Sequence, residues 1–232
     1  MEVIFTYIPI RLKDITEIYL KYSIEKLNNQ NIIPTLYSDH NYFYDSKLKY
    51  KWITLDIDEK YKREGFWPYA KLKTLSLIDR PFIHLDNDLV VHNFTLLKNI
   101  IIEDKLNLCY KHDVKEYQIP HFEQIFKMYS DNILSFKELN NTSIIATNEY
   151  KKINEAYKNV LNILENKYDS FLDRIYGIPP ITLNQQYLNL YFNNINYLFN
   201  ENPSFKNVNK NGVCHLAEKN MVSNFVLNKN LI

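Results

Sequence analysis

Glycine is scarce in this chain, which has three glycines in 232 residues, whereas about 7% is ordinary usage. The glycine-rich phosphate loops G-x-G-x-x-G and G-x-x-x-x-G-K-S/T are both absent. Such loops need glycine because their backbone approaches the phosphates closely. The composition therefore excludes dinucleotide-binding and P-loop proteins, and any phosphate group must be bound in another way.

Cysteine, long apolar runs and an excess of one charge are lacking as well. The two cysteines, Cys109 and Cys214, have no metal-ligand spacing and give no disulfide framework, which fits a reducing compartment. The first residues lack the pattern of a signal peptide, and no run of about 18 apolar residues exists, so we expect a cytoplasmic protein without a transmembrane segment. Lys and Arg number 28 against 27 Asp and Glu, and this net charge of +1 argues against a nucleic-acid partner.

The residues that are present indicate a globular α/β protein. Apolar, β-branched and aromatic runs predict strands at Glu2–Ile8, Ile32–Tyr37, Trp52–Leu55, Pro81–Leu85, Leu89–His92, Leu106–Tyr110 and Ser143–Thr147. Helical spacing predicts helices from Asp14 to about Leu27, at Trp67–Leu77, at about Asn148–Leu172 and at Leu183–Tyr191. The tail from Asn200 is expected to be a loop around a short apolar patch at Val213–Leu216. Strands that alternate with helices indicate an α/β sheet, and no linker or repeat divides the chain.

Two aspartates follow the apolar strand Pro81–Leu85. Asp86 and Asp88 are two residues apart, and the chain must turn between this strand and the next, so both carboxylates can face one cleft. In α/β sheets, ligands bind at the carboxyl ends of the strands. Paired hard oxygen ligands suit Mg²⁺ or Mn²⁺, which commonly accompany phosphates. A solvated Asp-Asn-Asp turn explains the spacing equally well.

This stretch resembles the D-x-D signature of GT-A-fold glycosyltransferases, which use nucleotide-sugar donors. It is most similar to the glycogenin and bacterial lipopolysaccharide galactosyltransferase type, in which the strand reads roughly YLDxDhhh. That type carries a basic residue about fifteen positions before the first Asp, where this chain has Lys71. Taken alone, Lys71 would be interpreted as a solvated helix lysine.

Three further motifs of that type occur in the expected order. Asn141 matches the Asn of FNSGhhhh, with Ser143 in place of the Gly. Gln185 matches the Gln of DQxxLN, although Asn replaces the preceding Asp. His215 and Lys219 match the residue types of a final His-x-x-Gly-x-x-Lys, but they are four positions apart and lack the Gly. Without the resemblance, these residues would be interpreted as turn, polar-face and structural residues.

The resemblance covers roughly residues 71–219. It implies one GT-A-like (Rossmann-like) domain over residues 1–232, with a mixed sheet flanked by helices and the D-x-D at the end of a central strand. Its nucleotide-binding half would be about 1–92 and its acceptor-side half about 93–232. The implied reaction is transfer of a sugar from a nucleotide-diphosphate sugar, expected to be UDP-linked, to a glycan or other acceptor, with Mn²⁺ or Mg²⁺ as cofactor.

The resemblance also implies roles for individual residues. The implied metal ligands are Asp86, Asp88 and His215, and the two aspartates act in catalysis together with Gln185. The implied donor-binding residues are Lys71, Asp86, Asn141 and Lys219. If the reaction inverts the sugar's configuration, it needs a carboxylate base. Asp113 and Glu218 are candidates for that base by location alone.

Two other classes of protein stay open. The pattern from Asp86 to Val90 also fits the D-x-D-x-T/V motif of haloacid-dehalogenase phosphohydrolases, in which the first Asp is the nucleophile. That family places the pair on its first strand, whereas about 80 residues precede it here. A non-catalytic carbohydrate-binding module would use the aromatic residues, 15% of the chain, for stacking and would need neither metal nor nucleotide.

Overall fold

The structure is a computed structural model that describes residues 1–10, 13–43, 47–63, 66–113, 138–166, 187–204 and 207–215. Its main element is a seven-stranded mixed sheet in the order β3-β2-β1-β4-β7-β6-β8. The strands are β1 (Glu2–Thr6), β2 (Thr35–Ser38), β3 (Lys51–Thr54), β4 (Phe82–Leu85), β6 (Leu106–Asp113), β7 (Glu138–Thr147) and β8 (Ile195–Tyr197). The strand that precedes the aspartate pair, β4, is therefore central.

The sheet is parallel on one side of β4 and mixed on the other. Strands β1, β2, β3 and β4 all run in the same direction. Strand β7 is antiparallel to both β4 and β6, and β8 is parallel to β6. Strand β1 lies between β2 and β4, so the strand order reverses beside β4, and the carboxyl end of β4 borders a switch point of the sheet, where α/β proteins bind ligands.

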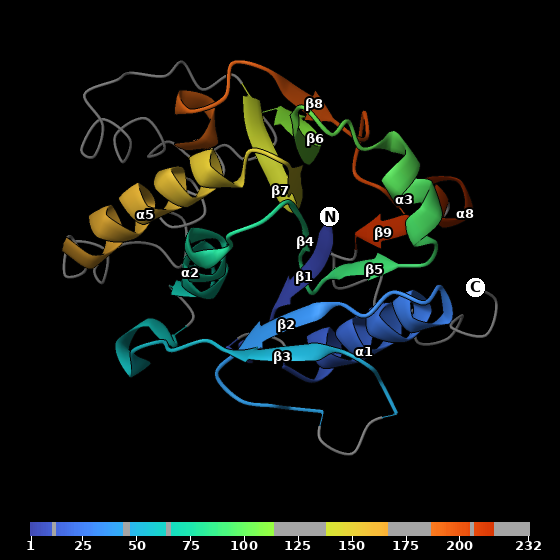
Figure 1. Ribbon diagram of the computed structural model, residues 1–232, viewed down its shortest axis with the longest axis horizontal. Coiled ribbons are helices and arrows are strands. Elements are labelled where there is room, and N and C mark those ends of the chain that lie inside the picture. The colour runs from blue at the N-terminus through green and yellow to red at the C-terminus, as the bar shows by residue number, and fades with distance from the viewer. Residues whose placement is uncertain are drawn as a thin grey trace.

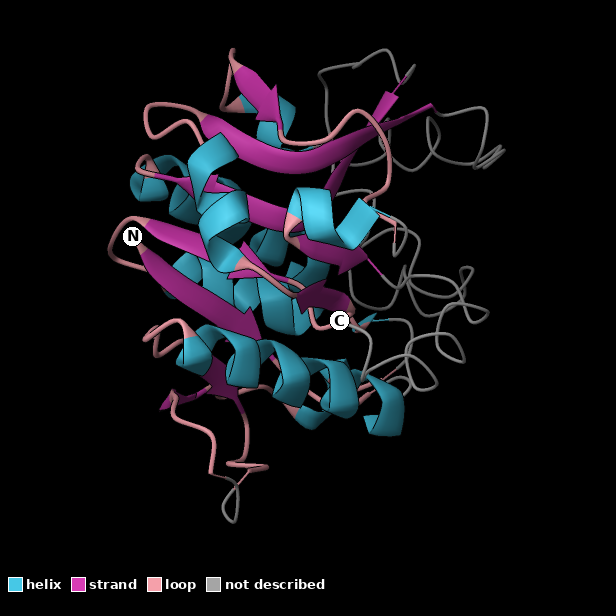
Figure 2. Ribbon diagram, turned by 90° about the vertical axis from the view of Figure 1, so that its right-hand side faces the viewer, coloured by secondary structure: helices cyan, strands magenta, loops and turns pink. Residues whose placement is uncertain are grey.

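Helices cover both faces of the sheet. The helices are α1 (Lys13–Asn29), α2 (Tyr69–Leu77), α3 (Phe94–Ile100), α5 (Tyr150–Asn166) and α8 (Val208–Asn211), with 3-10 turns η1 (Glu59–Tyr61) and η4 (Tyr187–Leu190). Figure 1 shows the sheet between α2 and α5 on its left and α1 and α3 on its right. Figure 2 views the molecule from that right-hand side, with helices in front of the strands.

Each face of the sheet has its own apolar core. The helix α5 buries a stripe at helical spacing, including Ile153, Tyr157 and Val160, in the cluster that also holds Leu72 and Leu75 of α2. On the other face, α1 and α3 bury a second cluster against the sheet, with Leu20, Ile24, Leu27, Phe94 and Leu97. Each of these side chains contributes about 1.5–3 kcal/mol by leaving water. The two cores fix the sheet from both sides.

A second, two-stranded sheet lies beside the main one. Its strands are β5 (Leu89–Val91) and β9 (Val213–His215), and they are antiparallel. The hydroxyl of Ser23 in α1 accepts a hydrogen bond from the Val91 amide at 3.0 Å, which attaches β5 to the helix. In this small sheet, the apolar patch that begins at Val213 pairs with β5, the strand that follows the aspartate pair.

The described residues confirm the predicted strands, and they also contain elements that were not predicted. Residues 94–100 form a helix and residues 195–197 a strand, neither of which was predicted. The tail from Asn200 was expected to be a loop around an apolar patch, but Val208–Asn211 is helix α8 and Val213–His215 is strand β9. Of the helix predicted at 183–191, the described part contains a 3-10 turn at Tyr187–Leu190, and residues 183–186 lie outside the described part of the chain. Residues 167–172 of the helix predicted at 148–172 lie outside it as well.

Within the described ranges, the longest helices are charged and amphipathic. None of the helices there is long and apolar enough to cross a membrane.

Candidate functional site

Asp86 and Asp88 lie in the tight turn between β4 and β5. The Asp86 amide donates to the Ser143 carbonyl of β7 at 2.9 Å, so this residue still belongs to the central sheet. The Leu89 amide then donates to the Asp86 carbonyl at 3.1 Å and closes the turn. As predicted, the aspartate pair ends a central strand.

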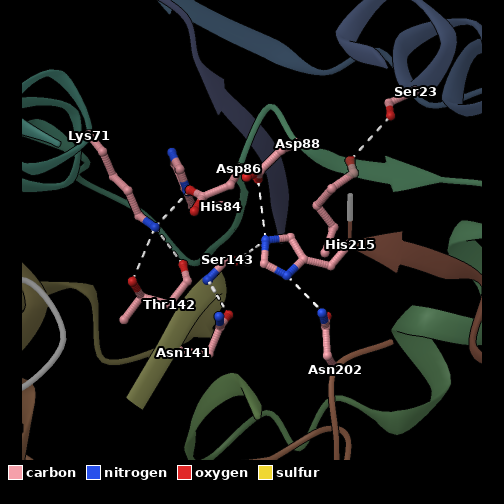
Figure 3. A network of polar contacts seen from close by, with 11 residues as sticks. Ser23, Lys71, His84, Asp86, Asp88, Asn141, Thr142, Ser143, Asn202 and His215 are labelled. Carbon is pink, nitrogen blue, oxygen red and sulfur yellow. Dashed lines mark hydrogen bonds and ion pairs between the residues drawn. The ribbon is translucent and has the colours of Figure 1, made fainter. Parts of the chain in front are cut away.

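Lys71 of α2 forms an ion pair with the first aspartate (Figure 3). Its Nζ lies 2.7 Å from Asp86 Oδ1 and donates to the Thr142 carbonyl at 2.5 Å. The residue is only 7% exposed, so the interpretation of Lys71 as a solvated helix lysine is wrong. Its charge is directed at the carboxylate turn. The contact with the donor that the family resemblance implies for this position stays a prediction.

Replacing Lys71 by alanine should destabilise the fold by about 3 kcal/mol, because it leaves the partly buried Asp86 carboxylate without its cation. At this chain length, such a loss lowers Tm by roughly 6–12 °C. Thermal unfolding of the purified variant measures the effect. Lys158→Ala removes an exposed lysine from α5 and is the matched control. Equal Tm values for the two variants would mean that the buried ion pair contributes nothing to stability.

His84 is the polar residue of β4, and sequence analysis assigned it no role. Its Nε2 lies 3.0 Å from Thr6 Oγ1 of β1, and its Nδ1 lies 3.8 Å from Asp86 Oδ1. Burial, reinforced by the Lys71 charge, holds the pKa of His84 well below its usual value, so the ring is neutral at pH 7. A histidine in an otherwise apolar strand, two residues before the first aspartate, was a signal in the sequence for a residue beside the site.

The pairing of β5 with β9 brings His215 to the second aspartate. In this register Leu89 lies opposite His215, so the residue before Leu89, Asp88, borders the imidazole. His215 Nε2 lies 3.5 Å from Asp88 Oδ1. The family resemblance implies that these two residues act together, and in the structure they lie side by side.

Two uncharged side chains also bond to the imidazole of His215. Ser143 Oγ lies 3.0 Å from Nε2, and Asn202 Oδ1 lies 3.0 Å from Nδ1 (Figure 3). Ser143 stands where the resembling family has glycine, so this departure adds a hydroxyl to the site. No motif in the sequence indicated Asn202, because its role depends on the path of residues 200–204 past β9.

Burial and charge act in opposite directions on this cluster. Burial raises the pKa of Asp86 above its usual value, although Lys71 opposes the shift. Burial also acts to raise the pKa of Asp88, but His215 outweighs it, and the pKa is lowered. Burial acts to lower the pKa of His215, but the Asp88 carboxylate outweighs it, and the pKa is raised. Asp88 and His215 therefore stabilise each other's charged forms.

The donor atoms in this cluster fit a hard divalent cation. Asp88 offers a carboxylate oxygen, the ligand type that Mn²⁺ and Mg²⁺ prefer, beside an imidazole nitrogen, which suits a transition metal such as Mn²⁺ better than Mg²⁺. The amide oxygen of Asn87, between the two aspartates, is buried and has no hydrogen-bond partner in the described part of the chain. The described residues contain no group of three His, Cys, Asp or Glu side chains already arranged around a cation position. Asp86 Oδ1 instead binds Lys71.

The other candidate residues are only partly described. Asn141 lies in β7 beside the cluster, 6% exposed, and its Oδ1 accepts from the Ser143 amide at 3.0 Å. Asp113 is the last residue of β6 and pairs in register with Glu138. Gln185, Glu218 and Lys219 lie outside the described residues.

The mixed sheet, with helices on both faces and an acidic turn at the end of its central strand, is the GT-A fold of nucleotide-sugar glycosyltransferases. The fold predicted from the sequence is therefore confirmed. At the sequence level, no protein-family model and no curated protein matches the chain.

Among solved structures, the chain is similar to an active-site mutant of LgtC, with 13% identity, 94% of this chain and 88% of that chain covered, and a TM-score of 0.50. It is also similar to galactosyltransferase LgtC in complex with donor and acceptor sugar analogues, with 12% identity, 94% and 88% covered, and a TM-score of 0.48. A glycosyltransferase involved in glycosylation of the major capsid of PBCV-1 gives 12% identity, 100% and 98% covered, and a TM-score of 0.48. At 13% identity, the likeness to the LgtC mutant establishes the fold alone, and the chemistry must be argued from the site.

Proposed function

We propose that this protein is a metal-dependent glycosyltransferase, folded as one domain, that moves a sugar from a nucleotide-diphosphate sugar to a glycan or other acceptor. The observation that carries the proposal is the convergence of Asp88 and His215 at the carboxyl end of the central strand of a GT-A fold. The chain has no glycine loop for phosphates, and a carboxylate–imidazole pair that holds a cation meets the same need. UDP is the expected nucleotide because the resembling family uses it.

In this proposal, Asp86, Asp88 and His215 hold Mn²⁺ or Mg²⁺. Asp86 also binds the donor, at its ribose. When bound, the cation offsets the negative charge of the diphosphate. Lys71 Nζ lies 2.7 Å from Asp86 Oδ1 and fixes this carboxylate, so that its orientation does not depend on the ligand. A preorganised carboxylate needs no rearrangement when charge develops on the leaving group, which is how such sites lower a barrier.

The remaining proposed roles follow the family resemblance. Asn141, which the structure places beside the cluster, would line the donor sugar. Gln185 would face the acceptor side, and Lys219 would contact the diphosphate. These three assignments would be tested by single alanine variants, which should weaken transfer without removing the Mn²⁺ site.

The two alternative classes are not favoured. A haloacid-dehalogenase phosphohydrolase carries its aspartate pair on the first strand, whereas the pair here follows β4. A carbohydrate-binding module has no need for a buried cluster of two aspartates, a lysine and a histidine. It would also use exposed aromatic rings, but many of the largest rings, including Tyr7, Tyr19 and Tyr157, are fully buried.

A thermal-shift screen of nucleotide sugars, with and without Mn²⁺, tests the proposal. A ligand at 100 times its Kd adds about 2.7 kcal/mol of stability, which is roughly 5–10 °C in Tm for a chain of this size. We expect a UDP-sugar to raise Tm with Mn²⁺ and to lose the effect when EDTA is added. UDP, other nucleoside diphosphates and free sugars separate recognition of the nucleotide from that of the sugar. A shift with glycans alone, or phosphate release from small phosphoesters, would contradict the proposal.

A further inference from the structure

His215 is held at three points by residues from three separate parts of the chain (Figure 3). Ser143 of β7 and Asp88 of the turn both face its Nε2, at 3.0 and 3.5 Å. Asn202 faces the other ring nitrogen, with Oδ1 at 3.0 Å from Nδ1. The residue is only 5% exposed, so water does not replace these contacts freely.

The contact with Asn202 is fixed by the backbone as well as by the side chain. The His215 amide donates to the Pro203 carbonyl at 2.8 Å, so the segment that carries Asn202 is bonded directly to the main chain of β9. Two hydrogen bonds therefore fix the relative positions of Asn202 and His215. One is made by the backbone amide of His215 and the other by its ring nitrogen Nδ1. An acceptor held in this way selects one orientation of the ring.

The chemistry of the two ring nitrogens makes this orientation important. The side-chain oxygen of Asn202 accepts a hydrogen bond, so Nδ1 must carry the proton in the pair. In the neutral ring, Nε2 then has a lone pair that faces the hydroxyl of Ser143 and the carboxylate of Asp88. Histidines that bind metals are commonly oriented in this way, by donating their second ring N–H to an oxygen.

We propose that Asn202 is a positioning residue that holds the proton of His215 on Nδ1 and keeps Nε2 available as a ligand for the divalent cation. This inference rests on the proposed function, because the cation is the one that the transfer reaction would use. Without the oxygen of Asn202, the ring can rotate or move its proton to Nε2, and it then presents an N–H to the cation position.

Two variants separate the oxygen acceptor from the shape of the side chain. Asn202→Leu keeps the approximate volume and removes the acceptor, whereas Asn202→Asp keeps an acceptor at the same position. Asn200→Ala changes an exposed asparagine in the same segment and is the matched control. If Asn202→Leu does not fold, Asn202→Ala makes the same comparison with less apolar volume.

The primary measurement is the Kd of Mn²⁺, from electron paramagnetic resonance of the free ion, with and without UDP. We expect Asn202→Leu to weaken Mn²⁺ binding by about 10–100-fold, and Asn202→Asp to remain within about threefold of the wild type. The control variant should bind as the wild type does. Thermal unfolding of the metal-free proteins shows whether the loss is separate from a loss of stability.

A second measurement needs no metal. Long-range proton–nitrogen NMR of the His215 ring, assigned with a His215→Gln variant, reports which nitrogen carries the proton at a pH where the ring is neutral. We expect the Nδ1–H form in the wild type and in Asn202→Asp, and the Nε2–H form in Asn202→Leu. A residue that only stabilised the fold would leave this tautomer unchanged.

The outcomes distinguish this inference from the proposed function. If the wild type binds Mn²⁺ and Asn202→Leu binds it equally tightly, the role of Asn202 is overturned and the proposed function stands. If the wild type binds no Mn²⁺ under either condition, the proposed cation site is overturned and the role of Asn202 is overturned with it.

Discussion

Asp88→Asn should abolish Mn²⁺-dependent transfer from a nucleotide sugar, with a fall in kcat/KM of about 10³-fold or more. Asparagine keeps the shape of the side chain but replaces a carboxylate oxygen with a neutral, weaker ligand. The change also removes the negative charge that lies 3.5 Å from His215 Nε2. In the wild type this charge raises the pKa of His215. Because the proposed cation acts where charge develops on the leaving diphosphate, its loss raises the barrier directly.

The rate of sugar transfer or hydrolysis from a UDP-sugar, with Mn²⁺ and with EDTA, measures this effect. Asp104→Asn makes the same chemical change at an exposed position before β6 and should retain full activity. The Mn²⁺ Kd of Asp88→Asn should rise together with the loss of rate. Full activity in Asp88→Asn would overturn the assignment of this turn as the cation site.

The central part of the fold could be predicted from the sequence because its elements carry strong local patterns. The strand before Asp86 is a continuous apolar run, and helix α5 has apolar residues at helical spacing, so each element could be located by its own residues. The short helix α3 was missed although Asn93 is a suitable cap residue. Its side chain accepts from the Leu96 amide, and the apolar residue Phe94 follows directly. That helix has seven residues, too few for periodicity alone to reveal it.

Strands β8 and β9 could not be predicted in the same way. Each has three residues, and each exists because of a partner far away in the sequence, β6 for β8 and β5 for β9. Such short segments have no stable structure without that partner. Local pattern therefore indicated only an apolar patch at Val213, although the patch carries the histidine of the candidate site.

In the candidate site, too, residues could be predicted where a local pattern marks them, and contacts between distant segments could not. Asp86 and Asp88 could be identified because a strand delivers both of them, and the resemblance supplied Lys71 and His215. The contacts that hold these residues were not visible, because they join distant segments: Lys71 to Thr142, and His215 to Asn202. From the sequence, Ser143 was only a departure from the family motif, which has glycine there. In the structure, the hydroxyl of Ser143 faces Nε2 of His215, the proposed ligand atom.

One of the three glycines explains how β9 reaches β5. Gly212 follows α8 with a φ of +73°, and its amide donates to the Val208 carbonyl at 2.8 Å. Its own carbonyl accepts from the amides of His92 and Asn93, both at 2.8 Å, directly beyond the end of β5. A Cβ at this position would lie 2.2 Å from the Asn93 carbonyl oxygen. In a chain with so little glycine, this position has one because the left-handed backbone disfavours a side chain and the close approach leaves no room for one.

Gly212→Ala should therefore destabilise the protein by about 3 kcal/mol or more, since alanine adds the cost of a left-handed conformation to a collision with backbone atoms. The corresponding fall in Tm is roughly 6–12 °C.

Because β9 must shift away from β5 to relieve the collision, His215 should also move away from Asp88, and the Mn²⁺ Kd should rise even where the protein remains folded. Gly212→Asn tolerates the left-handed backbone better but has the same Cβ, so it should recover only part of the lost stability. Lys210→Ala, at an exposed position of α8, is the control and should change Tm little. If Gly212→Ala unfolded at the wild-type Tm and bound Mn²⁺ with wild-type affinity, the close approach of β9 to β5 could not be what forms the site.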